Sequence, residues 1–198
     1  MVVAKEQMQE EAIRLFQTYG YKNVSVEMIC RSFHVTRGSF YHYFKNKDDL
    51  LLQWLYSFTS KLDNPQDQDP SLSAYERMQS QLYTWAEELE KLGPELLHDM
   101  IGAVYNQMDP SLQQEETIAS FSILPDSSHV FELIQQAQDE GDVDCTQTPR
   151  QLERIYSYAV AGLCISWFLS KDVISFTDEV KMIFVRVFGD GKQSDSKT

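Results

Sequence analysis

Apolar side chains recur along this chain at intervals of three and four residues, which is the spacing of one face of an α-helix. The first such segment ends at Gly20, because glycine commonly closes helices. Ser25 offers a side-chain oxygen to the free N–H groups of a second helix, and Glu27 suits its first turn. The chain is therefore predicted to open with two helices. The apolar face of the first holds Met8, Ala12, Leu15, Phe16 and Tyr19.

The same periodicity continues towards the C-terminal end of the sequence. Seven more helices are expected, at about 36–43, 47–62, 71–92, 94–108, 126–140, 149–170 and 176–188. Residues 63–70 hold two prolines and three acids and predict a linker, while residues 109–125 predict a loop. No segment alternates polar and apolar residues for long enough to form a sheet. The expected fold is all-α, with about nine helices.

Residues 25–47 carry the most informative pattern, because they predict two short helices joined by a turn of about three residues. A helix-turn-helix of this kind places its second helix in the major groove of DNA. Arg37 and Tyr41 are four residues apart and point the same way. Arginine binds guanine with two hydrogen bonds, whereas hydroxyl and ammonium groups suit phosphate oxygens. The candidate DNA-binding residues are Ser25, Thr36, Arg37, Gly38, Ser39, Tyr41, His42, Lys45 and Lys47.

The distribution of charge agrees with this interpretation. A formal net charge of −13 makes the chain as a whole a poor partner for nucleic acid. Residues 1–47, however, carry a net charge of +3, and the remaining residues carry −16. A basic segment on an acidic body indicates an anionic partner, although chance clustering accounts for the charge alone equally well. For Tyr41, His42 and Lys47, the alternative is a solvated surface without a partner.

The remaining composition narrows the class of protein. The three cysteines form no CxxC pair and the four histidines form no HxxxH pattern, so neither disulfide bridges nor a metal site is expected. No nucleophile–base pair or phosphate-binding loop is present, and we expect neither enzymatic activity nor a cofactor. The N-terminus lacks an apolar leader, and the longest apolar run, 155–170, falls short of the roughly 20 residues of a membrane span. A cytoplasmic protein without a membrane partner is therefore expected.

The stretch VTRGSFYHYFKNKDDLL resembles the signature that ends the DNA-binding region of TetR/AcrR-type transcriptional regulators. The matching positions are Val35, Thr36, Gly38, Phe40, Tyr41, Tyr43, Phe44, Lys47 and Leu50. Two features depart from the family pattern: Cys30 stands for an alanine, and Phe33 and His34 stand for a small residue and a glycine before the turn. The resemblance implies base reading by Arg37, positions near the groove for Thr36, Ser39 and His42, and phosphate binding by Ser25, Tyr41 and Lys47.

The resemblance also implies a DNA-binding domain at 1–47 and a ligand-binding and dimerisation domain at 48–188. The tail at 189–198 is polar and is expected to be disordered. The helix at 150–170 is apolar on nearly all sides and must be covered on all sides. One recognition helix reads few base pairs, so we expect a homodimer whose interface is the last two helices. The alternative is a monomer with 150–170 as its central core helix. The expected interface residues are Ile155, Tyr158, Ala159, Gly162, Ile165, Phe176, Val180, Ile183, Phe184 and Val187.

In related regulators the middle helices enclose a pocket for a small molecule, and the resemblance implies such a pocket here. Methionine and aromatic side chains adapt well to apolar ligands, although at helical spacing they are more often plain core. The acidic body either favours a cationic ligand or only confers solubility, and this choice stays open. The candidate lining residues are Trp54, Phe58, Met78, Leu82, Leu97, His98, Met100, Ile101, Tyr105, Phe131 and Trp167.

These observations together predict a ligand-responsive transcriptional regulator that binds a palindromic double-stranded DNA operator as a homodimer. Most relatives are repressors that a small-molecule effector releases, and we expect the same here, with a largely apolar effector. The alternative is a TetR-like fold that has lost DNA reading and acts as a co-regulator through protein–protein contacts. Salt-sensitive binding to duplex DNA separates the two, because only neutralisation of phosphates gives a steep salt dependence.

Overall fold

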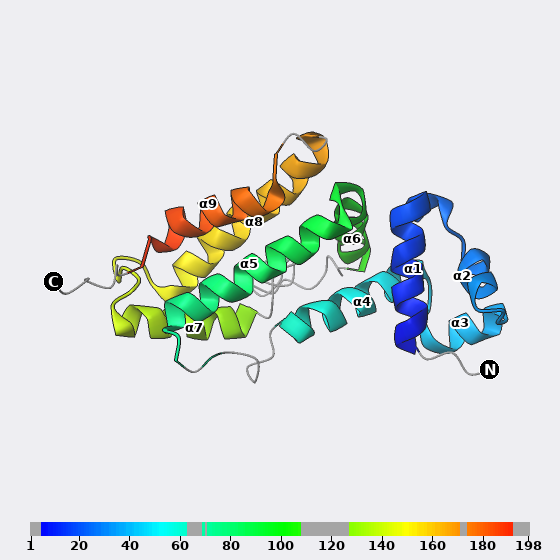
Figure 1. Cartoon of the computed structure of the whole chain (residues 1–198), viewed down its shortest axis with the longest axis horizontal. Coiled ribbons are helices and arrows are strands. Elements are labelled where there is room, and N and C mark those ends of the chain that lie inside the picture. Colours follow the sequence, from blue (N-terminus) through cyan, green and yellow to red (C-terminus); the bar gives the residue numbers. More distant parts are fainter. Residues whose placement is uncertain (1–4, 63–68, 70, 108–126, 171–173, 192–198) are drawn as a thin grey trace.

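Helices account for most of the chain that the computed structural model describes, namely residues 5–62, 69, 71–107, 127–170 and 174–191. Those residues form nine α-helices, one 3₁₀ helix and no strand (Figure 1). The predicted all-α fold with a helix-turn-helix head is confirmed. The helices are α1 (Lys5–Tyr19), the 3₁₀ helix (Tyr21–Asn23), α2 (Val26–Ser32), α3 (Arg37–Tyr43), α4 (Lys47–Leu62), α5 (Ala74–Leu92), α6 (Pro94–Gln107), α7 (Ser127–Glu140), α8 (Pro149–Ser170) and α9 (Phe176–Phe188).

Local signals in the sequence set many of the helix ends. Ser25 caps α2, because its hydroxyl oxygen accepts a hydrogen bond from the backbone N–H of Met28 at 3.2 Å. Ser73 and Glu76 form a reciprocal capping box at the start of α5. The 3₁₀ helix was not predicted. It follows Gly20, whose φ of 81° turns the chain at the end of α1.

The head is a three-helix unit at one end of the molecule, built from α1, α2 and α3 (Figure 1). Its core is apolar: Phe16, Ile29, Phe40 and Phe44 are 2% exposed or less. Burying one such side chain stabilises the fold by roughly 1.5–3 kcal/mol. The same core fixes how α3 is rotated about its axis. It therefore decides which side chains of α3 reach the surface.

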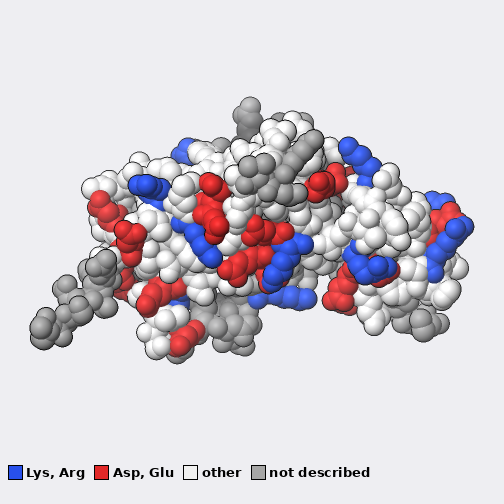
Figure 2. All heavy atoms as spheres, turned by 45° about the horizontal axis from the view of Figure 1, so that its top comes forward, with Lys and Arg blue, Asp and Glu red and all other residues white. Residues whose placement is uncertain are grey.

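The body packs its helices around α5, which lies against both α7 and α9 (Figure 1). Pairs of helices complete it: α8 packs against α9, and α4 leads from the head and packs against α6. The inward face of α9 carries Phe184, whose ring centre lies 5.4 Å from that of Tyr75 on α5 and 6.4 Å from that of Tyr156 on α8. Figure 2 shows acidic side chains spread over this body, several of them beside a lysine or arginine.

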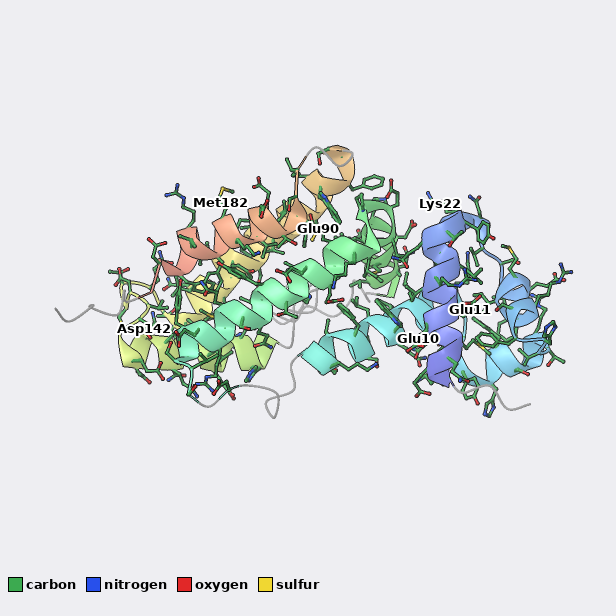
Figure 3. All side chains as sticks on the ribbon, viewed as in Figure 1. Glu10, Glu11, Lys22, Glu90, Asp142 and Met182 are labelled. Carbon is green, nitrogen blue, oxygen red and sulfur yellow. The ribbon has the colours of Figure 1, made fainter. Side chains whose placement is uncertain are left out.

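A polar contact ties α5 to the start of α9. One carboxylate oxygen of Glu90 accepts a hydrogen bond from the backbone N–H of Phe176 at 2.9 Å, and the other accepts one from the Thr177 hydroxyl. Figure 3 shows Glu90 on α5, near the start of α9. The first N–H groups of a helix lack partners within that helix, and its N-terminal end attracts negative charge. Glu90 therefore fixes where α9 begins on α5.

Three predicted segments lie wholly or largely outside the described residues. They are the linker at 63–70, the loop at 109–125 and the tail at 189–198, of which the structure describes Asp69 and 189–191. The division of the chain after residue 47 also stays a prediction, because α4 begins at Lys47 and continues into the body. Of the helices that the structure describes, none has the length and apolar character needed to cross a membrane.

Candidate DNA-binding interface

The turn between α2 and α3 is a helix-ending motif in which His34 takes the place usual for glycine. The backbone N–H of Val35 donates to the carbonyl of Cys30 at 3.0 Å, and that of His34 donates to the carbonyl of Arg31 at 3.1 Å. This pair of hydrogen bonds defines a Schellman motif, which requires a left-handed residue after the helix. His34 has a φ of 55°, and no other non-glycine residue in the described part of the chain has a positive φ. The sequence departs from the family pattern here, but the turn still forms.

Burial of Phe40 and Phe44 turns the opposite side of α3 toward solvent. The half-buried Ser39 has its hydroxyl oxygen 3.3 Å from that of Thr36. The arrangement agrees with the periodicity of the sequence, whereas contact with DNA stays a prediction. The exposed candidates are Thr36, Arg37, Gly38, Tyr41, His42 and Lys45.

The sequence from α2 to the start of α4 carries positive charge and no acidic residue of its own after Glu27. Residues 28–47 contain four basic residues and no Asp or Glu. Of the four, Arg31 forms an ion pair with Glu27 on the same helix at 2.5 Å. The Arg37 guanidinium donates a hydrogen bond to the Tyr41 hydroxyl oxygen, which raises the pKa of the guanidinium. Among the described ion pairs, none involves Arg37 or Lys45. These two residues therefore supply the charge of the exposed side.

Ser25 and Gly38 are placed so that either can approach a phosphate backbone. The hydroxyl of Ser25 accepts its capping hydrogen bond, so its own proton remains for donation. A Cβ atom on Gly38 would meet nothing nearer than the Thr36 hydroxyl oxygen at 3.5 Å, an ordinary contact. Packing within the head therefore does not require a glycine at this position. The sequence suggested another reason for Gly38, namely that it lets the α3 backbone approach a ligand closely. This reason stays a prediction.

Lys47 lies differently from the expectation of a phosphate-binding group. Its ammonium donates to the backbone carbonyls of Tyr21 at 2.8 Å and Val24 at 2.7 Å, and it lies 4.3 Å from the centre of the Tyr21 ring. Burial lowers the pKa of Lys47. The Tyr21 hydroxyl in turn donates to Asp48. Because the 3₁₀ helix was not predicted, the carbonyls of Tyr21 within it and of Val24 just after it were not considered as partners. In the structure, Lys47 ties that turn to the start of α4.

The expected pocket residues lie at buried, half-buried and exposed positions in the structure. Trp54 and Phe58 are half-buried, and their rings stack with centres 5.0 Å apart. His98 stacks on Phe168 with ring centres 3.9 Å apart, and Tyr105 is 66% exposed. That these residues enclose an effector stays a prediction. Met78, Leu82, Leu97, Met100 and Trp167 are buried in the core, and Ile101 and Phe131 are half-buried.

Three expected interface residues belong to the core of the chain itself. Phe176, Val180 and Phe184 are 0% exposed, because the inward face of α9 packs on α5 and α8. Their assignment to a subunit interface was therefore wrong. The outward side of α8 and α9 exposes Ile155, Tyr158, Ile165, Leu169 and Met182, with Ala159, Gly162, Ile183 and Val187 exposed or half-buried. Leu169 and Met182 were not among the expected interface residues, and Figure 3 shows Met182 on the outer side of α9.

The contact between head and body depends on further residues that the sequence did not single out. The side-chain amide of Gln17 on α1 donates to the backbone carbonyls of Lys91 at 3.1 Å and Leu92 at 3.5 Å, at the end of α5. Burial raises the pKa of Asp99 on α6, although nearby positive charges, including that of Lys22 in the head, oppose the rise. A contact between residues more than seventy positions apart leaves no local pattern, and Gln17 was therefore missed.

The head is similar to a known family of proteins. Residues 10–53 match the family model of bacterial regulatory proteins of the tetR family, a range that spans the helix-turn-helix and reaches into α4. A Bacillus subtilis (strain 168) protein, described as the uncharacterized HTH-type transcriptional regulator YuxN, is 34% identical over 79 residues. That match covers 37% of this chain and 27% of the relative, so the chain spans about a quarter of the relative's length.

Solved structures share the fold over nearly the whole chain. Thermus thermophilus FadR, a TetR-family transcriptional repressor in complex with lauroyl-CoA, has a TM-score of 0.67 at 17% identity, covering 98% of this chain and 99% of that chain. The regulatory protein TetR from Rhodobacter sphaeroides has a TM-score of 0.64 at 21% identity, covering 93% and 98%. At these identities the similarity shows the fold alone. The head of the chain is thus similar to the DNA-binding region of the tetR family, and its described helices share the fold of solved TetR-family regulators.

Proposed function

We propose that the chain is a DNA-binding transcriptional regulator that reads its operator through α3. The observation that carries the proposal is the exposed side of α3, where Arg37, Tyr41, His42 and Lys45 lie in a stretch without acidic residues. Arg37 can bind one guanine with two hydrogen bonds, which discriminate between bases by about 1–3 kcal/mol. Lys45 takes the phosphate-binding role at the end of α3, because the Lys47 ammonium already binds two carbonyls.

The regulator acts as a homodimer on a palindrome. Support comes from the outward side of α8 and α9, where five large apolar residues are 44–71% exposed. Contiguous apolar surface on a folded protein usually marks an interface. A second copy of the same chain covers this surface under two-fold symmetry. Two heads then meet two half-sites of a palindromic operator.

A small, largely apolar effector binds in the body and releases the regulator from DNA, which makes the protein a repressor. The proposal is supported by the description of the Thermus thermophilus relative as a repressor with bound lauroyl-CoA. The half-buried Trp54 and Phe58 lie on α4, the helix that leads from the head into the body. An effector that favours one position of α4 therefore favours one placement of the head. Effector and operator weaken each other's binding by the same factor.

Selection of bound fragments from random duplex DNA tests the reading of bases. The wild-type protein is expected to enrich a palindrome. Arg37→Ala relaxes the preference at the base pair that Arg37 contacts, at a cost of about 1–3 kcal/mol for the selected sequence. Lys45→Ala instead weakens binding to every sequence alike and lowers the slope of binding against salt by about one unit.

Gln135→Ala is a suitable control, because Gln135 is exposed on α7 in the body. This variant is expected to bind the selected palindrome with wild-type affinity and salt dependence. A wild-type protein that enriches no sequence at low salt contradicts DNA reading by the head. An Arg37→Ala protein that selects the same palindrome with unchanged preference contradicts the role of Arg37 alone.

A further inference from the structure

The turn between α2 and α3 carries an imidazole that no contact within the described chain explains. His34 adopts a left-handed conformation, with a φ of 55°, which glycine would adopt without strain. Its side chain is exposed, and within the described part of the chain no hydrogen bond, ion pair or ring contact involves that side chain. Backbone strain that internal packing does not require points to a function. The imidazole is available to a partner outside the chain.

The place of this turn in the helix-turn-helix brings His34 to the edge of the DNA groove. The first helix of such a pair crosses the DNA backbone, and the N-terminal end of the second helix contacts base edges. His34 lies between the two, after α2 ends at Ser32 and before Arg37 begins α3. Figure 1 shows α2 and α3 on the side of the head that faces away from the body. We therefore expect a phosphate beside the groove to lie next to this imidazole when α3 binds DNA.

Histidine differs from the other candidate DNA contacts because its charge changes near neutral pH. Its ordinary pKa of about 6.5 is the only one among the side chains that lies between about pH 5 and pH 8. A protonated imidazole carries a positive charge and donates hydrogen bonds from both ring nitrogens, so it binds a phosphate more strongly than the neutral form does. The head holds two histidines, His34 and His42.

Among the side chains around this turn, only histidine is suited to take up a proton near neutral pH. Glu11 on α1 faces Ser32 at the end of α2, and a hydrogen bond from Arg14 lowers the pKa of the Glu11 carboxyl. Burial raises the pKa of the Cys30 thiol on α2. Carboxylate, phenol, ammonium and guanidinium groups ordinarily titrate outside the range of histidine. Those that remain on α2, on α3 and in the two residues that follow α3 are Glu27, Arg31, Arg37, Tyr41, Tyr43 and Lys45.

We propose that His34 is a proton-dependent contact to a DNA phosphate, through which the regulator binds DNA more tightly at about pH 6 than at about pH 8. The inference rests on the proposed function, because it assumes that α3 enters the major groove. A neighbouring phosphate favours the protonated imidazole, so binding to DNA takes up a proton. By linkage, a lower pH then strengthens binding. The contact adds affinity without reading the sequence of bases.

The test compares the affinity of the full-length chain for the selected palindrome and for a duplex of mixed sequence, at about pH 6 and about pH 8 and at one salt concentration. His34→Asn is the central variant, because asparagine tolerates the left-handed conformation and carries no charge. The wild type is expected to bind both duplexes more tightly at the lower pH. His34→Asn should lose about threefold to tenfold of that rise for each bound head, and at the higher pH it should bind within about twofold of the wild type.

Salt dependence and a permanent charge give independent readouts. At about pH 6, the slope of log affinity against log salt should be steeper in the wild type than in His34→Asn by about one unit per head, and at about pH 8 the two slopes should agree. His34→Lys is charged at both pH values, so it should lose the same part of the pH dependence while keeping the tighter binding. His129→Gln, on α7 in the body, is the matched histidine control and should keep the wild-type profile. Circular dichroism confirms that each variant is folded.

The outcomes separate this inference from the proposed function. Binding to duplex DNA whose pH dependence is the same in the wild type and in His34→Asn overturns the inference and leaves DNA binding intact. An equal loss of affinity at both pH values in His34→Asn overturns it too, because a purely structural role has that effect. If His42→Asn alone removes the whole pH dependence, the proton belongs to α3 and His34 is not the contact. A wild-type protein that binds neither duplex at either pH contradicts the proposed function itself, and the inference with it.

Discussion

At the scale of single residues, His34 is the position where local strain is most directly testable. Its φ of 55° is unfavourable for a residue with a Cβ atom, by roughly 1–2 kcal/mol. Glycine adopts this conformation without strain but loses more conformational entropy on folding. His34→Gly is therefore expected to stabilise the protein by roughly 0.5–1 kcal/mol. The measurement is the midpoint of urea unfolding at an unchanged m-value.

His34→Val provides the opposite case at the same position. A β-branched residue tolerates positive φ least, so this variant should be less stable than the wild type. Arg37 and Lys45 keep their positions in the glycine variant, which should therefore select the same operator. A His34→Gly protein that unfolds at lower urea would show that the histidine side chain contributes more stability than its backbone conformation costs.

Lys47 shows where a motif read from sequence falls short at this scale. The sequence pattern correctly predicted that Lys47 lies at the junction of α3 and α4. A motif does not show, however, in which direction a long side chain points. That direction depends on the carbonyls of Tyr21 and Val24, which converge only because a 3₁₀ helix follows Gly20. Ser25 was predictable in detail, since its partner is the N–H of Met28 three residues away.

At the scale of helices, Glu90 makes the joint between α5 and α9 sensitive to pH. Burial opposes its charge, but hydrogen bonds from Thr177, Ser175 and Phe176 outweigh that effect and lower the pKa of Glu90. A lowered pKa stabilises the fold above the ordinary pKa of a glutamate, and this stability is lost as the pH falls through the lowered value. Glu90→Gln is expected to cost roughly 1–2 kcal/mol at pH 7.

The pH profile separates the charge of Glu90 from its shape. The difference in unfolding free energy between wild type and Glu90→Gln should be constant near neutrality and shrink below about pH 4. Glu87→Gln is a matched control on α5, because the Glu87 carboxylate is 53% exposed and pairs with Lys181 at 3.4 Å. A constant difference between wild type and Glu90→Gln down to pH 2 would show that the carboxylate charge is not the stabilising feature.

The helices themselves were predictable, whereas their neighbours were not. Periodicity and caps depend on residues within one or two turns, so the start of α8 at Pro149 and both ends of α9 agree with the sequence. Phe176, Val180 and Phe184 were recognised as one apolar face. The sequence does not say whether such a face meets the same chain or a second one, and the choice of a second chain was wrong. Glu90 and Gln17 act over more than seventy residues and left no local sign.

At the scale of the whole molecule, the exposed apolar side of α8 and α9 predicts a homodimer. Ile165 is 56% exposed and lies between Tyr158 and Leu169 on the outward side of α8. Ile165→Arg places a charge in the centre of this surface. In a two-fold interface every substitution occurs twice, so two unpaired charges would have to lose water. The dimer dissociation constant is expected to rise by at least about a hundredfold.

Light scattering distinguishes the two states, because the dimer has twice the 23.0 kDa mass of the chain. At a concentration where the wild type is dimeric, Ile165→Arg should have the monomer mass, while Gln135→Arg on α7 should remain dimeric. A monomer presents one head, so affinity for a palindrome should fall while binding to a half-site persists with the same base preference. Weaker binding to the palindrome together with retained binding to the half-site therefore indicates loss of the dimer. Loss of the fold would remove half-site binding too. A wild-type protein with the monomer mass, or an Ile165→Arg protein that stays dimeric, would assign the exposed apolar side to another partner.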